Sequence, residues 1–159
     1  MGSHSTISTA RIARLTTIGK VEAISEELFD VQPPQFNNTI RWNVGHLFTT
    51  LDLLVFQRIS QTSLLPAGYA ELFKTGTKPS DWTSTPPSKA ELLELLKKQL
   101  DDLLNTYADR ADEQISAPLQ IRDFKLETVG DVIGFLTIHE ALHATVISDL
   151  LKVIHHQSK

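Results

Sequence analysis

The sequence predicts an all-α fold, a four-helix bundle whose helices are joined by long crossover loops. Four stretches carry apolar residues at offsets of three and four, as amphipathic helices require. Prolines and glycines interrupt the chain between them, and no internal repeat or low-complexity tract occurs. The 159 residues fit one domain, 1–159, which can bury most of its apolar surface in a single core.

The first two helices are predicted over about 6–30 and from about Asn38 onward. Pro33-Pro34 ends the first, and Asn37 or Asn38 can cap the second. The first apolar stripe is Leu15, Ile18, Val21, Ile24 and Leu28, and the second is Trp42, His46, Thr49, Leu53 and Phe56. The stretch 63–87 that follows is a long crossover with a short apolar piece around Tyr69, Leu72 and Phe73.

The third and fourth helices have the clearest start signals. Ser88 and Glu91 form a capping-box pattern before a leucine-rich helix that runs to about Tyr107, and Thr128 with Asp131 repeats the pattern. The apolar line of the last helix is Val132, Phe135, Leu136, His139, Leu142, His143, Val146 and Leu150. Between these helices, 119–122 alternates briefly and suggests a short extended piece, but no sheet is expected.

Composition excludes several functional classes. The absence of cysteine rules out disulfide scaffolds and thiolate metal ligands and favours the cytoplasm. With 15 Lys and Arg against 19 acidic residues, and no basic cluster longer than Lys97-Lys98, nucleic acid is not an expected partner. No apolar run approaches the ~20 residues that span a bilayer, so no membrane association is expected.

The two ends of the chain carry no predicted function. The opening Met1-Gly2-Ser3-His4 lacks the apolar stretch of a signal peptide, and the first few residues, His4 included, are given no role. His155 and His156 are interpreted as solvated residues at a helix end.

Three histidines occupy apolar helix lines: His46, His139 and His143. The last two are four residues apart and therefore share a helix face. An unpaired polar group in the interior costs roughly 1–3 kcal/mol, so three inward imidazoles are better explained by one shared divalent metal. Spacing alone leaves the alternative open that each is a core histidine bonded to a backbone carbonyl.

The segment Asn38-Thr39-Ile40-Arg41-Trp42-Asn43-Val44-Gly45-His46-Leu47, with His139-Glu140-Ala141-Leu142-His143 much later, resembles the DinB and YfiT-like superfamily of four-helix bundles. The resemblance covers nearly the whole chain. It implies that His46, His139 and His143 bind one divalent transition metal, zinc or nickel. The chain departs from the Gly-Gln-type continuation common after the second histidine, with Ala144-Thr145-Val146-Ile147 instead, which weakens transfer of any member's substrate.

Three imidazoles leave a coordination position open to water or substrate, as in catalytic zinc sites. The leading hypothesis is a metal-dependent hydrolase or thiol-dependent transferase that acts on a small molecule, with a low-molecular-weight thiol as a candidate co-substrate. A homodimer is expected from symmetry and family precedent. The alternative is a non-catalytic bundle that binds metal or a small ligand, in a role such as stress response.

Other residues have competing interpretations. His139-Glu140-Ala141-Leu142-His143 matches the H-E-x-x-H pattern of metalloproteases, which makes Glu140 a candidate catalytic general base; otherwise its carboxylate is solvated or supports a ligand. The third ligand lies upstream rather than downstream, which argues against a protease. Asn43 and Thr50 are either ordinary polar residues or orient His46. Trp42 is expected in the core, and Trp82 is a pocket lid or a loop anchor.

Overall fold

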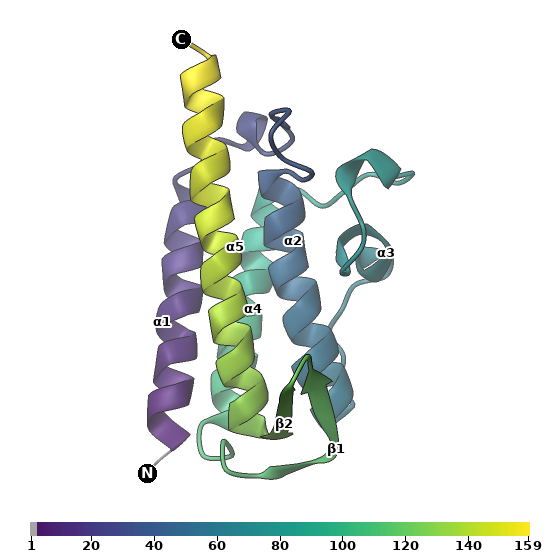
Figure 1. Ribbon diagram of the computed structural model, residues 1–159, viewed down its shortest axis with the longest axis vertical. Coiled ribbons are helices and arrows are strands. Elements are labelled where there is room, and N and C mark those ends of the chain that lie inside the picture. The colour runs from purple at the N-terminus through teal and green to yellow at the C-terminus, as the bar shows by residue number, and fades with distance from the viewer. Residues whose placement is uncertain (1–2) are drawn as a thin grey trace.

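Four long helices form the predicted bundle in a computed structural model that describes residues 3–159, with side chains from Ser5 onward. They are α1 (Ser3–Glu22), α2 (Ile40–Leu51), α4 (Lys89–Tyr107) and α5 (Val129–Gln157). Met1 and Gly2 of the opening segment lie outside the described residues. Helices α1 and α5 run side by side in the same direction, while α2 and α4 run the opposite way (Figure 1).

Short helical elements fill the connections. A 3-10 turn, η1 (Glu26–Leu28), follows α1, and a π-helix, η2 (Asp52–Ser60), continues α2. The crossover from α2 to α4 contains α3 (Tyr69–Phe73) and a second 3-10 turn, η3 (Pro79–Asp81). The apolar piece predicted inside the crossover is therefore a helix, and Tyr69, Leu72 and Phe73 are all buried.

Several helix boundaries and buried positions differ from the prediction. Helix α1 ends at Glu22, because Ser25 adopts an extended backbone with ψ 136° before η1 begins. Leu15 was assigned to the buried stripe but is 47% exposed. Thr39, not Asn37 or Asn38, caps α2: its side chain accepts a hydrogen bond from the backbone N–H of Trp42.

The two capping predictions have different outcomes. Thr128 and Asp131 form the complete capping box of α5. At α4, Ser88 accepts a hydrogen bond from the backbone N–H of Glu91, as predicted, but the Glu91 carboxylate accepts one from the Tyr69 hydroxyl at 2.6 Å. The second half of that box is thus replaced by a bond that fastens α3 to α4.

The absence of a sheet was a wrong prediction. Strand β1 (Gln114–Ile121) pairs antiparallel with β2 (Phe124–Thr128) in a hairpin beside α5. Most hairpin positions are exposed, so the apolar alternation that marks a half-buried strand is weak. Its turn contains Arg122 at φ 52°, where glycine or asparagine is the usual turn signal.

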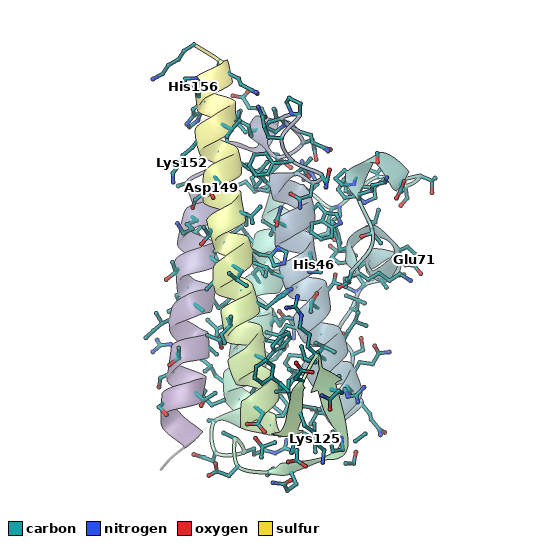
Figure 2. The ribbon with its side chains drawn as sticks, in the orientation of Figure 1. His46, Glu71, Lys125, Asp149, Lys152 and His156 are labelled. Atoms are coloured by element: carbon teal, nitrogen blue, oxygen red, sulfur yellow. The ribbon has the colours of Figure 1, made fainter. Side chains whose placement is uncertain are left out.

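The bundle core consists of two apolar clusters separated by polar side chains. One cluster includes Ile18, Phe48, Leu96 and Ile147, and the other includes Ile7, Leu51, Leu103 and Leu136. Between these positions on α1, α4 and α5 lie three buried polar residues, Arg14, Gln99 and Glu140. We call these three residues the polar layer. His46 is also buried and lies near the middle of α2 (Figure 2). Within residues 3–159, no helix is long and apolar enough to cross a membrane.

Candidate metal centre

The three predicted histidines converge between α2 and α5. One ring nitrogen of each of His46, His139 and His143 lies within 4.8 Å of the others. His46 Nε2 and His139 Nε2 are 3.1 Å apart. Two nitrogens that bind one zinc tetrahedrally at ~2.0–2.1 Å lie roughly 3.4 Å from each other, so this pair needs little adjustment to share an ion. The donor set fits a divalent transition metal.

A backbone carbonyl fixes the protonation of His46. Its Nδ1 lies 2.7 Å from the carbonyl oxygen of Phe73. Because a carbonyl can only accept a hydrogen bond, Nδ1 carries the proton. The lone pair of the neutral ring then lies on Nε2, the atom that faces His139. Such a bond from the remote ring nitrogen is the usual support of a metal-binding histidine.

Gly45 allows α3 to reach this position. A Cβ at residue 45 would lie 2.4 Å from the Phe73 ring, closer than real contacts permit. The glycine therefore lets the Phe73 ring pack directly on α2, next to the residue whose imidazole it fixes. The crossover loop thus contributes to the site through its main chain, even though none of its side chains is a ligand.

Asn43 fixes His143 in a comparable way. Its Nδ2 donates to the carbonyl oxygen of Thr39 at 2.8 Å and to Asn38 Oδ1 at 2.9 Å. Since the Thr39 carbonyl can only accept, the amide orientation is determined, and Oδ1 accepts from His143 Nδ1 at 2.8 Å. The lone pair of His143 is left on Nε2. The sequence left Asn43 as either an ordinary polar residue or a residue that orients His46, and the structure shows that its histidine partner is His143.

Aromatic rings surround the cluster. Trp42 is buried in the core, as predicted, and stacks on His46 with ring centroids 4.5 Å apart and planes 12° apart. Phe135 stacks on His139 at 6.5 Å. Thr50 Oγ1 lies 3.4 Å from His46 Nδ1, beside the shorter bond to Phe73. Trp82 is a loop anchor: its Nε1 donates to the Leu72 carbonyl oxygen at 2.9 Å, and its ring packs edge-on against Phe73.

The environment keeps the three imidazoles neutral. Burial lowers the pKa of His46, partly offset by its bond to Phe73. Burial, reinforced by repulsion from His46, lowers the pKa of His139 to about 4. Burial, with repulsion from His139 and His46, lowers the pKa of His143 to about 3. Neutral imidazole is the form that binds metal, so the folded protein presents three imidazoles that could hold a metal ion at neutral pH.

Glu140 lies apart from the histidine nitrogens. Its carboxylate is 5% exposed and forms a two-point ion pair with Arg14, at 2.7 Å from Nε and 3.1 Å from Nη2. The carboxylate is therefore neither solvated nor a partner of a histidine. Within the described chain, the ligand group contains the three histidines and no carboxylate.

The polar layer joins all four long helices at the height of the cluster. Arg14 of α1 also donates to Gln99 Oε1 at 2.8 Å, and Gln99 Nε2 donates to the Phe48 carbonyl oxygen of α2 at 2.9 Å. Arg14 and Gln99 were missed by the sequence analysis. Arg14 falls on the buried line of α1 between Ala10 and Ile18, so its position on that face was the available signal. The Phe73 carbonyl left no sequence signal, because backbone groups do not depend on residue type.

Comparison with known proteins agrees with this geometry. A family model of the DinB superfamily matches residues 10–147, a span that includes all three histidines. No curated protein matches the chain. The bundle brings these three histidines together. Because the family match covers most of the chain, the chain belongs to the DinB superfamily.

Proposed function

We propose that this protein is a metal-dependent enzyme that acts on a small molecule, as a hydrolase or a thiol-dependent transferase. The observation that carries the proposal is the convergence of one ring nitrogen from each of His46, His139 and His143 within 4.8 Å. Carbonyl oxygens of Phe73 and Asn43 hold two of these rings with Nε2 free to bind. Zinc and nickel suit such an imidazole set.

A bound divalent metal would supply a Lewis acid that activates a water or thiol nucleophile. The protein's own contribution is to hold the ligands neutral and oriented. Trp42 covers one face of His46 and excludes water from it. His46 is buried whereas His139 and His143 are partly exposed, so a substrate reaches the cluster from the α5 side. Because only three protein ligands converge, a further position is available to the substrate.

A non-catalytic metal-binding or small-ligand-binding bundle is the second candidate. One observation favours it: the Glu140 carboxylate is held by Arg14, and no other carboxylate joins the histidine group in the described chain. An enzyme at this site would have no acidic side chain of its own next to the ligands. Turnover would then depend on the metal and on a group brought by the substrate or the thiol.

The test begins with metal content. Protein prepared without a metal-affinity column should bind about one zinc or nickel per chain, measured by elemental analysis and titration. His46→Ala, His139→Ala and His143→Ala should each lower the affinity strongly. His155→Ala, an exposed histidine of the same helix as His139, is the matched control and should bind like the unmodified protein.

Turnover is then measured with activated esters and with transfer of a small thiol to monochlorobimane. Activity that requires the metal and disappears in His139→Ala supports the enzyme. Stoichiometric metal binding without turnover in either assay would favour the binding protein. No metal binding at all would overturn both. Sedimentation of the same samples tests whether the protein is a homodimer.

A further inference from the structure

An apolar groove of about 620 Å³ lies between the β1–β2 hairpin and α5, where the hairpin stands beside the first half of that helix (Figure 1). Large apolar side chains line both walls, and three are mostly exposed: Phe124 at 69%, Ile138 at 63% and Leu142 at 63%. Exposed apolar side chains that gather in one concave place mark a binding surface, whereas single ones do not. Volumes of this size are typical of small-molecule sites.

The groove meets the histidine cluster at Phe135. This ring lines the groove and also stacks on His139, with centroids 6.5 Å apart. Ile138 and Leu142, which form the same wall, directly precede His139 and His143 in the chain. On a helix these positions form a stripe immediately beside the two histidines. The groove therefore adjoins the partly exposed side of the cluster.

The groove also contains an available positive charge. Arg122 lines it, and among the described residues its guanidinium has no ion-pair partner. Its backbone has φ 52°, the left-handed conformation that the tight turn of the hairpin requires, so the side chain is presented at the hairpin tip. The acidic residue of the groove, Asp131, is already engaged, because its carboxylate accepts from the backbone N–H groups of Glu127 and Thr128.

We propose that this groove binds the body of the substrate, a small molecule with an aromatic or other apolar core and an anionic substituent. The apolar core contacts Phe124, Ile138 and Leu142, and the anionic group pairs with Arg122. The part of the molecule that enters beside Phe135 lies next to His139. The placement of one end of the substrate next to His139 rests on the proposed function, whereas binding in the groove can be tested without metal.

The test uses two fluorescent probes, 8-anilinonaphthalene-1-sulfonate and its uncharged relative N-phenyl-1-naphthylamine. Both should bind saturably to the metal-free folded protein. Ile138→Ser should weaken both by roughly tenfold, since it removes part of the apolar contact. Arg122→Gln should weaken the sulfonate by about fivefold and leave the neutral probe unchanged. Ile12→Ser is the matched control, because Ile12 is 66% exposed on α1 and lies outside the groove.

Addition of Co²⁺ should quench the fluorescence of the sulfonate probe bound to the unmodified protein but not of the probe bound to His139→Ala. This comparison tests whether the probe lies beside the histidine cluster. Probe binding without this quenching, in protein that binds Co²⁺, overturns the inference. So does equal weakening by Ile12→Ser, or a dimer that dissociates on Ile138→Ser, which would assign the groove to a second copy. Metal titration of the same samples reports on the proposed function separately: loss of metal binding with probe binding intact contradicts that function alone.

Discussion

Asn43 and His143 lie on different helices, and the amide oxygen of Asn43 accepts a hydrogen bond from His143 Nδ1 at 2.8 Å. Because the Asn43 amide nitrogen is committed to Thr39 and Asn38, the amide cannot turn over without losing two bonds. The start of α2 therefore determines which nitrogen of an α5 imidazole is free. His46, on the same helix as Asn43, is fixed from the other direction by α3.

Asn43→Ala should weaken zinc binding by about 10- to 100-fold, the usual effect of removing the support of a ligating histidine. His143 would lose the partner that keeps its proton on Nδ1. Competition titration against a chromophoric chelator measures the change. Thr50→Ala is the control, since its hydroxyl only adjoins a ring already bonded to Phe73, and it should stay within a few fold of the unmodified protein. Equal effects of the two variants would show that Asn43 has no such role.

Gly45→Ala should lower both stability and metal affinity. The new methyl would lie 2.4 Å from the Phe73 ring, so α3 must move and the bond from His46 to the Phe73 carbonyl must lengthen. Overpacking of this kind costs about 1–3 kcal/mol. Thermal unfolding and zinc titration follow the two effects. Adding Phe73→Leu should recover part of the stability by making room; no recovery would mean that the clash is not with this ring.

Glu140→Gln should destabilise the protein more than it alters metal binding. The substitution leaves the 2%-exposed Arg14 without its counter-charge. Breaking a buried pair on one side costs about 3–5 kcal/mol, or roughly 6–20 °C in Tm for a domain of this size. The double variant Arg14→Met with Glu140→Leu should regain much of that loss. If Glu140→Gln instead abolishes turnover with Tm and metal content unchanged, Glu140 is the general base.

The sequence predicted the bundle and the histidine cluster because periodic patterns carry that information, whereas the crossover helix α3 was predicted only as a short apolar piece. Apolar spacing locates a helix face, and two histidines four residues apart must share one. The side of α5 that faces the core was predicted less accurately. Leu142 was placed inside and is 63% exposed, whereas Glu140 was given an outward or catalytic role and is buried. A charged residue is assigned outward unless its partner is known, and Arg14 is far away in the sequence.

The groups that hold the histidine rings in place could not be predicted from the sequence, for a different reason. The Phe73 carbonyl acts through the main chain, and its position depends on how α3 packs over Gly45. The role of Asn43 depends on which helix faces it, so the sequence offered its neighbour His46, and not His143, as a candidate partner. The hairpin was missed because a mostly exposed pair of strands lacks the alternation of a half-buried sheet.

Removal of metal should lower the melting temperature without unfolding the protein. Both apolar clusters are complete without an ion, so the metal-free chain should keep its helical circular dichroism at room temperature. A metal that binds only the folded state adds ~2.7 kcal/mol at a free concentration a hundredfold above Kd. Thermal unfolding scans with zinc and with a chelator measure the difference in melting temperature. The His46→Ala variant should melt at the same temperature under both conditions. Loss of helicity on chelation would make the site structural.

Acid should destabilise the metal-free protein through the histidine cluster. Imidazoles in the unfolded chain have a pKa of about 6.5, whereas burial and mutual repulsion lower the pKa of His139 to about 4 and of His143 to about 3 in the fold. The unfolded state therefore binds more protons between these values. The free energy of unfolding of the metal-free protein is therefore highest above about pH 6.5 and decreases as the pH falls toward 4.

The Tm of the metal-free protein should accordingly stay level above neutrality and decrease between pH 6.5 and 4. His139→Leu with His143→Leu should decrease less over this range, and His155→Gln, which alters an exposed histidine, should follow the unmodified protein. Depressed pKa values also weaken proton competition for the ligands. Zinc should therefore remain bound below pH ~6, where ordinary imidazoles would release it. A melting curve whose pH dependence is the same in the double leucine variant would assign the acid sensitivity to other groups.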